Sequence, residues 1–580
     1  MRHIKKMLQM QSNKGLEIHV VEIEGEIKIM GEYILMKKLC FSTGILLMSI
    51  LVLALLTTMS VNAETTTTNA TNTTNTAVTT STTPTGKVVK IGLFYSSSAQ
   101  EQIELSAAQG IAFSSFNAKT SGYTSILSFT KNESVTIKRD TMLHIKIGAS
   151  YGDYQAALTA VNTYKGNGVT AYPVFTDAGW QVWSGFFANQ GEVDKAIADI
   201  KTKTTADCSA VSVSSTRVYV QDKSSQVMFM YASDVEYLRG KSLSTTSPAP
   251  IKIGKSNYRG EVEFQRRTNS DMTIINVLPI EHYLYGVVPN EIEGSANIEA
   301  VKAQAVAART FAYYSIQSSK HTSVGFDLCA STCCQSYIGY DSEYSSSSSA
   351  VDATADMVIK YNGKLIQTPY FASSGGKTED AVNVWGYEFN YLKSVDDTFE
   401  SGNSYNYNWT KTFTIDELTQ KFASKNIGTV TAIEVTKRSN AGRATEVVVR
   451  GTLNPQGIIY RLEGSRTLLS LPSQWYTIST SSDVSITTPS QVINTQLNNL
   501  SIISTSGNVV QSAGTSIDVI SADGSKQSLS FNPTQYVFTG KGWGHAVGMS
   551  QEGAKGMANA GYTCEQILTH YYQGTTVEQR

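Results

Sequence analysis

Hydrophobic and polar positions divide the start of the chain into three kinds of sequence. Residues 1–35 show no periodicity, so no fold is expected for them. Residues 36–63 have a basic start, a long apolar run and a small-residue end, which is the pattern of a signal peptide. The run is also long enough for a retained membrane anchor, and Met36 is a candidate true start. Residues 64–86 hold 13 threonines in 23 positions, which predicts a solvated linker.

Apolar residues then alternate between strand spacing and helix spacing. Over 140–203 they predict the order strand, helix, strand, strand, helix. This order resembles a SPOR domain, which implies a module that binds peptidoglycan glycan strands stripped of their peptides. A generic small α+β module with aromatic core residues is the alternative. We assign the strand-like residues of 87–139 to a larger domain that continues at 204–580, with the module inserted between them.

The longest helical pattern begins at Asn297, a good N-terminal capping residue. Apolar residues recur from Ile298 to Ala312 at spacings of 3, 4, 3 and 4, which predicts a buried stripe. Lys302 and Arg309 lie seven residues apart and border that stripe. They either line a cleft for an oxygen-rich or carboxylate ligand, or they lay their stems along the edge of the core.

Three motifs, in order, resemble the stage II sporulation protein D family, which also contains amidase-enhancer proteins. They cover 286–291 with 299–310, then the Ser-Gly-Gly loop at 370–378, then 540–551. The resemblance implies a lytic transglycosylase that acts on peptidoglycan. One departure is Ala546, where the family usually has glycine, and a side chain there is tolerated unless φ is positive.

Cleavage of a glycosidic bond needs a carboxylic acid that protonates the leaving oxygen. A lytic transglycosylase needs only one carboxyl group, because the same residue later acts as a base while the sugar's own 6-hydroxyl attacks. The resemblance implies that this residue is Glu291, with Lys302 and Arg309 as basic residues of the active site, and Glu293 is the competing carboxylate. It also suggests four further substrate contacts: Tyr370, Ser374, His545 and Gln551. A histidine such as His545 can equally be structural.

One histidine and three cysteines crowd into fourteen positions after the long helix: His321, Cys329, Cys333 and Cys334. These residue types form a Cys₃His zinc set, and some family members hold a zinc here with mixed ligands. We expect a structural ion, because protein side chains would fill all four positions. A Cys329–Cys334 disulfide is the alternative in an exported protein. A zinc hydrolase is disfavoured, because the chain has no H-E-x-x-H motif.

The charge composition argues against nucleic acid as a partner. Lys and Arg number 47 and Asp and Glu 48, so the basic footprint of a nucleic-acid protein is missing. Strands and turns from 430 to 539, added to the helices, predict an α+β fold with a strand-rich larger domain. The segment 385–409 is rich in Tyr and Asn, which suits a sugar-lined groove or a long loop.

The combined prediction is an exported enzyme of the cell wall, or of the outer face of the membrane if an anchor is retained. Its partner is the glycan strand, and no cofactor besides structural zinc is expected. The alternative is a non-enzymatic wall binder that activates a partner amidase.

Overall fold

The computed structural model describes residues 87–580, with gaps at 131–132, 267–270 and 406 and at several short stretches between 488 and 531. All these residues belong to the unit Pro84–Arg580. The predicted extension (1–35), signal peptide or anchor (36–63) and linker (64–86) lie outside the described residues. Within the described part, no helix combines the length and apolar character needed to cross a bilayer.

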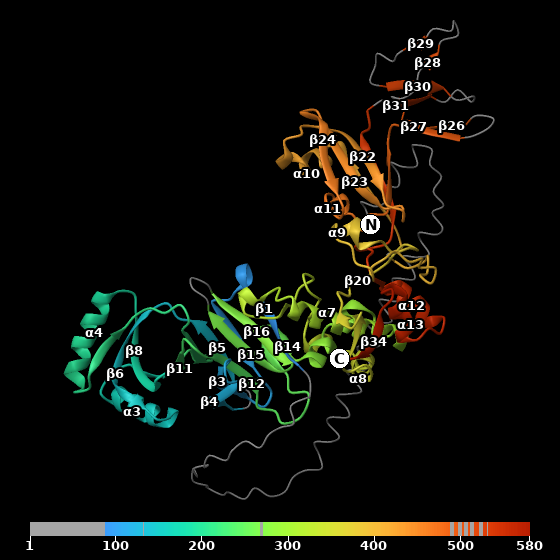
Figure 1. Cartoon of the computed structure of the whole chain (residues 1–580). Coiled ribbons are helices and arrows are strands. Elements are labelled where there is room, and N and C mark those ends of the chain that lie inside the picture. The colour runs from blue at the N-terminus through green and yellow to red at the C-terminus, as the bar shows by residue number, and fades with distance from the viewer. Residues whose placement is uncertain are drawn as a thin grey trace, which may run out of the picture. The chain divides into compact units, whose positions relative to one another are not determined.

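The fold is α+β and rich in strands, as the sequence predicts (Figure 1). A seven-stranded sheet packs beside the helices that carry the motifs. In spatial order its strands are β17 (Leu328–Cys329), β1 (Val88–Phe94), β16 (Met272–Pro279), β15 (Glu261–Arg266), β12 (Tyr237–Ser242), β3 (Ile111–Asn117) and β4 (Gly122–Phe129).

A second sheet has ten strands and runs from the larger domain into the predicted module. In spatial order these are β14 (Ser256–Tyr258), β13 (Ile251–Ile253), β2 (Gln102–Ser106), β5 (Ser134–Arg139), β10 (Val218–Asp222), β11 (Val227–Ala232), β7 (Tyr172–Thr176), β8 (Gly179–Phe187), β6 (Leu143–Tyr151) and β9 (Cys208–Val211). The junction is the parallel pairing of β7 with β11, where Val174 lies opposite Met230.

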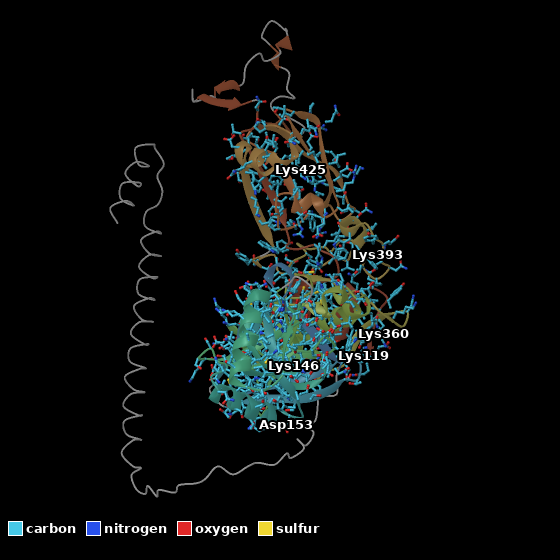
Figure 2. The ribbon with its side chains drawn as sticks, turned by 90° about the vertical axis from the view of Figure 1, so that its left-hand side faces the viewer. Lys119, Lys146, Asp153, Lys360, Lys393 and Lys425 are labelled. Atoms are coloured by element: carbon cyan, nitrogen blue, oxygen red, sulfur yellow. The ribbon has the colours of Figure 1, made fainter. Side chains whose placement is uncertain are left out.

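Within 140–203 the element order β6, α3 (Tyr154–Gly166), β7, β8, α4 (Gln190–Lys203) is the predicted one. The side chain of Asp153, labelled in Figure 2, caps α3 by accepting from the backbone N–H of Ala156. Three aromatic residues of the module are buried in it: Tyr172, Trp180 and Trp183. The domain boundaries and the likeness of this segment to a SPOR domain stay predictions.

The helix α7 (Ile298–Gln317) is the centre of the motif-bearing region. Asn297 accepts from the N–H of Glu299 and so caps it as predicted. The sequence predicts one buried stripe, but α7 is buried on nearly every side. The elements that pack most extensively against it are α8 (Ser345–Ala353), α12 (Gln551–Asn559), α13 (Cys564–Tyr571) and β18 (Met357–Tyr361). The many alanines of α7 let these neighbours approach closely.

Short elements hold the motif loops around α7. The helices are α5 (Ile280–Tyr285), α6 (Val288–Glu291) and α9 (Ala381–Trp385), with 3-10 turns at Ser96–Ser98, Thr322–Val324 and Tyr340–Ser342. The strand β18 pairs with β19 (Lys364–Leu365) and β34 (Thr576–Gln579), and β20 (Tyr370–Phe371) pairs in parallel with β33 (Met549–Ser550).

A separate hydrophobic core lies between residues 408 and 541. Its strands are β21 (Asn408–Thr414), β22 (Val430–Arg438), β23 (Ala444–Gly451), β24 (Asn454–Arg461), β25 (Tyr476–Thr480) and β32 (Gln535–Lys541). Its helices are α10 (Ile415–Lys421) and α11 (Gly464–Thr467), with a 3-10 turn at Ala423–Lys425. Three hairpins follow: β26 (Asp483–Thr487) with β27 (Val492–Gln496), β28 (Ile502–Ile503) with β29 (Val509–Val510), and β30 (Ser516–Ile520) with β31 (Lys526–Ser530).

Candidate active site

Glu291 ends the short helix α6 and is half-buried. Its Oε1 accepts from the backbone N–H of Ser336 at 3.0 Å. Burial raises the pKa of its carboxyl group above the ordinary value, and hydrogen bonds from Ser336, Tyr370 and Gln551 oppose that rise. Glu293 differs, because its side chain is 73 % exposed and lies 4.0 Å from Lys555 Nζ. Of the two carboxylates, Glu291 has the environment of a general acid.

The parallel pairing of β20 with β33 brings two of the motifs together. Tyr370 lies opposite Met549, two residues before Gln551, so both side chains reach Glu291. Because α6 carries the first motif, all three motifs contribute to the surroundings of one carboxyl group. The structure thus brings Glu291, Tyr370 and Gln551 into one cluster.

Two buried glutamines that the sequence prediction missed complete this cluster. The Tyr370 hydroxyl lies 2.9 Å from Gln335 Oε1, so its one proton faces two acceptors, Gln335 and Glu291. Gln335 in turn donates to the Tyr283 hydroxyl at 3.2 Å. Gln551 Nε2 donates to Gln304 Oε1 at 3.4 Å. Gln304 is fully buried, and its Nε2 has no hydrogen-bond partner among the residues described. The sequence could have pointed to Gln304, because it lies among the alanines of a buried helix and a buried amide group there requires a hydrogen-bond partner.

Arg309 and Lys302 bind acidic residues of the protein itself. Arg309 is fully buried, with Nε 2.8 Å and Nη2 2.6 Å from the two carboxylate oxygens of Glu281. Lys302 Nζ lies 2.8 Å from Glu299 Oε1. In the part of the chain that is described, neither cation forms an ion pair with Glu291. Their role as substrate-binding residues stays a prediction.

Ser374 belongs to a loop that wraps around a buried carboxylate. Its backbone N–H and its hydroxyl donate to Glu400 Oε2 at 2.9 Å and 2.7 Å, and Gly375 N–H donates to the same oxygen. Arg443, which is also buried, donates to the carbonyl oxygen of Ser374 at 2.7 Å. The predicted substrate contact of Ser374 is therefore a hydroxyl that already has a partner in the protein. Sequence reasoning did not find Glu400 or Arg443, because they lie 26 and 69 residues from Ser374 along the chain.

His545 lies between two aromatic rings, Phe371 at 5.4 Å and Trp385 at 5.2 Å between ring centroids. Its Nδ1 accepts from the N–H of Val547 at 3.1 Å, and burial lowers its pKa to about 4. The ring is therefore neutral at physiological pH. The next residue, Ala546, has φ of +67°. We expect alanine to be tolerated at this position only if φ is negative. Because φ is positive, Ala546 carries backbone strain that a glycine would avoid.

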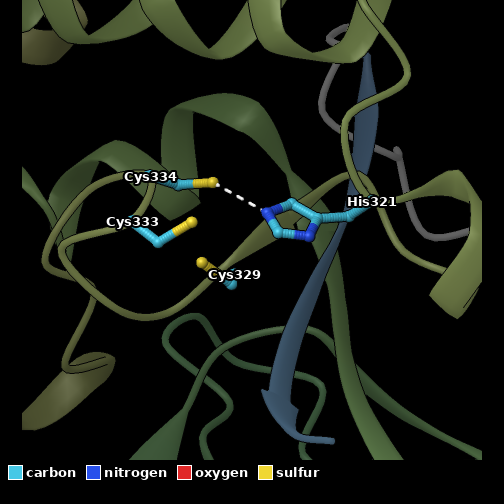
Figure 3. Close-up of side chains that lie close together, drawn as sticks. All are labelled: His321, Cys329, Cys333 and Cys334. Atoms are coloured by element: carbon cyan, nitrogen blue, oxygen red, sulfur yellow. Dashed lines mark hydrogen bonds between the residues drawn. The ribbon is translucent and has the colours of Figure 1, made fainter. Parts of the chain in front are cut away.

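His321, Cys329, Cys333 and Cys334 converge, as Figure 3 shows, with their ligand atoms all within 4.8 Å of one another. Tetrahedral zinc with bonds of about 2.3 Å places sulfur atoms roughly 3.8 Å apart, so this donor set fits the ion after small adjustments. The cysteines are free thiols, and no Cys329–Cys334 disulfide is formed. Hydrogen bonds from Cys334 and Ser331 lower the pKa of the Cys329 thiol, which favours the thiolate that metals bind.

The candidate metal centre lies next to the candidate acid along the chain. Cys334 directly precedes Gln335 and Ser336, which contact Tyr370 and Glu291. On the other side, β17 pairs Cys329 with Gly92 of β1. An ion held by these ligands would therefore fix the loop that presents the Ser336 N–H.

Comparison with known proteins matches the chain to a family model and to several relatives. A family model described as "Stage II sporulation protein" matches residues 268–361. The amidase enhancer of Bacillus subtilis (strain 168) is 33 % identical over 306 residues, which is 51 % of this chain and 40 % of that protein. An uncharacterized protein of Brachyspira hyodysenteriae is 30 % identical over 314 residues, 53 % of this chain and 69 % of its own length.

Stage II sporulation protein D of Bacillus subtilis (strain 168) is 27 % identical over 353 residues, 58 % of this chain and 85 % of that protein. The chain thus spans two fifths of the length of the amidase enhancer and most of the length of the sporulation protein.

Proposed function

The chain belongs to the stage II sporulation protein D family, and from that premise we propose that it is an exported peptidoglycan lytic transglycosylase. The observation that carries the proposal is Glu291: a half-buried carboxyl group with a raised pKa, where all three motifs meet. In this proposal the enzyme cleaves between N-acetylmuramic acid and N-acetylglucosamine in strands without peptides. The segment 140–203 holds the strand, using surfaces other than its buried aromatic residues.

Glu291 acts twice in this mechanism. Protonated Glu291 gives its proton to the glycosidic oxygen, and the bond from that oxygen to C1 of the muramic acid breaks. The resulting carboxylate then takes the proton of the 6-hydroxyl of the same sugar while its oxygen bonds to C1, giving a 1,6-anhydro product. The Ser336 N–H, the Tyr370 hydroxyl and the Gln551 amide stabilise the carboxylate between the two steps. Zinc, if bound by the cluster of His321 and the three cysteines, supplies no chemistry and stiffens the loop that carries Ser336.

The test is product analysis with a matched pair of variants. Glu291→Gln should lower anhydro-muropeptide release from stripped glycan strands by 10³-fold or more, because the proton donor is lost. Glu293→Gln changes an exposed neighbour and should leave the rate within about twofold. Mass spectrometry of the products is the readout. If the unaltered protein releases no anhydro products from stripped or intact peptidoglycan, the proposal is wrong.

A second candidate function follows from the 33 % identity to an amidase enhancer. Under this proposal the chain binds the wall and activates a partner amidase without cleaving glycan. Glu291→Gln separates the two functions. An enhancer would stimulate the amidase equally well with either residue, whereas stimulation that depends on cleaved glycan would be lost with glutamine.

A further inference from the structure

A cavity of about 580 Å³ opens between the end of α9 and the segment that joins β24 to α11. Its volume lies within the range of roughly 300–1,000 Å³ that small-molecule sites occupy. Six side chains line it with amide, aromatic and charged groups: Gln367, Trp385, Tyr387, Phe389, Arg461 and Glu463. None of them belongs to the cluster around Glu291.

The two walls of this cavity are fixed to each other. Glu463 N–H donates to the carbonyl oxygen of Val384 at 3.0 Å, which joins the segment after β24 to α9. Gly386 has φ of +80° and ends α9. The turn places Tyr387 on the rim, where it is 71 % exposed. The ring is therefore accessible to a ligand that enters the cavity.

The cavity lining combines aromatic rings with the guanidinium group of Arg461, which can bind an anion. Aromatic rings stack on the C–H faces of sugar rings, and Trp and Tyr also offer a polar tip. Arg461 is anchored by one nitrogen, Nε, at 2.9 Å from Glu446 Oε2, while its side chain remains 62 % exposed. The rest of its guanidinium group has the planar fork that pairs with a carboxylate.

A row of packed rings connects the cavity to the candidate acid. Trp385 lines the cavity and contacts His545 at 5.2 Å. His545 in turn contacts Phe371 at 5.4 Å, and Phe371 follows Tyr370 in β20. Packed side chains therefore join the cavity to the candidate acid, and the row includes the buried Phe371.

We propose that this cavity is a distal sugar subsite, which binds an N-acetylmuramic acid unit of the glycan strand by stacking on Tyr387 and Trp385 and by pairing its lactyl carboxylate with Arg461. The inference rests on the proposed function for the kind of strand that enters, but it does not depend on which residue performs the chemistry. Free lactyl carboxylates occur only where the peptide has been removed, so Arg461 gives the site a preference for stripped strands.

Equilibrium binding by the full-length Glu291→Gln protein tests this subsite without turnover. The probes are chitin oligosaccharides, which lack carboxylates, stripped glycan strands, which carry them, and peptide-bearing strands. Adding Tyr387→Ala should weaken binding of chitin oligosaccharides and stripped strands by up to about tenfold, because the stacking ring is lost. Adding Arg461→Gln should weaken only the stripped strands, by about tenfold. Folding should survive this change, because Glu446 keeps Lys437 at 3.2 Å.

Matched controls come from the same region. Tyr405→Ala removes a tyrosine that is 91 % exposed and lies outside the cavity, and Arg450→Gln removes an arginine from the neighbouring strand β23. Both should bind all probes like the parent. The inference is overturned if Tyr387→Ala binds as tightly as Tyr405→Ala, or if Arg461→Gln weakens chitin oligosaccharides as much as stripped strands.

An effect of Arg461→Gln confined to peptide-bearing strands would mean that a stem-peptide carboxylate occupies the site, which would also overturn the assignment to the sugar. If the Tyr387 and Arg461 variants behave as expected but the unaltered protein releases no anhydro product, the subsite proposal is supported and the proposed transglycosylase activity is wrong.

Discussion

At Glu291, burial and hydrogen bonding act on one pKa in opposite directions. Burial dominates, so the acid form persists to higher pH than in water, while three hydrogen bonds keep the carboxylate accessible. A residue that must act as acid and then as base needs both forms. The pH dependence of activity should therefore follow the pKa of Glu291, which burial raises and the hydrogen bonds lower.

Tyr370→Phe removes a hydrogen bond that favours the carboxylate, so the pKa of Glu291 should rise further. Activity that requires protonated Glu291 is lost as pH rises through that pKa. The alkaline limb of the kcat/KM profile should accordingly move to higher pH in the variant. Tyr476→Phe is the control, since its hydroxyl donates to Ser465 in the separate core, and its limb should stay in place. A limb that moves down with Tyr370→Phe contradicts this account.

Ala546 is strained by its positive φ, so Ala546→Gly should stabilise the protein. The left-handed conformation costs alanine roughly 1–2 kcal/mol, part of which the flexibility of glycine in the unfolded chain offsets. We expect a gain of about 1 kcal/mol in the free energy of unfolding, measured by denaturant titration. Ala554→Gly, in the middle of α12 and on its buried face, is the opposite control and should lose about 1 kcal/mol. Equal losses in both variants would contradict the strain.

At the scale of elements, α7 depends on an ion pair that its own sequence does not reveal. Arg309 is buried in the fold. The carboxylate of Glu281 from α5 neutralises its charge, and the carbonyl oxygens of Val351 and Met357 accept further hydrogen bonds from it. The helix can therefore hold a charge within its buried surface.

Arg309→Met should lower the free energy of unfolding by up to about 3–5 kcal/mol, because Glu281, whose side chain is only 18 % exposed, loses its partner. The double variant with Glu281→Leu should recover most of that loss. Lys302→Met breaks a half-exposed pair and should cost less than about 1 kcal/mol. Denaturant unfolding measures all three. If Arg309→Met stays fully stable but binds glycan strands weakly, the residue is a substrate ligand as the sequence resemblance implies.

The sequence predicted those elements whose causes are local. The cap at Asn297, the stripe of α7 and the order of elements in 140–203 depend on residues a few positions apart. The partners of Arg309, Ser374 and Gln551 are 28, 26 and 247 residues away. Such pairs follow from topology, which spacing along the chain does not encode. The metal cluster was accessible to sequence reasoning because its four ligands are close neighbours in the chain.

At the scale of the whole molecule, the cluster of His321 and the three cysteines joins the end of α7, the edge of the seven-stranded sheet and the loop of Ser336. Protein purified under reducing conditions should contain one zinc per chain by metal analysis. Removing it with a chelator should lower the unfolding temperature and weaken activity, because the Ser336 N–H loses its position. Cys333→Ser should reduce the metal content, while Cys208→Ser, outside the cluster, should not. Zinc well below one per chain would refute the site.

The parallel pairing of β7 with β11 has a mechanical consequence. The segment 140–203 is joined to the rest of the ten-stranded sheet by a backbone ladder at Val174, Phe175 and Thr176 in addition to its chain ends. A cell wall under turgor stretches its glycan strands. If the segment 140–203 binds a glycan strand as proposed, a pull along β7 would load the hydrogen bonds to β11 in shear, several at once, a geometry that resists force better than breaking them one at a time. Under the proposed function, the sheet would therefore carry the load from the bound glycan strand to the domain that holds Glu291.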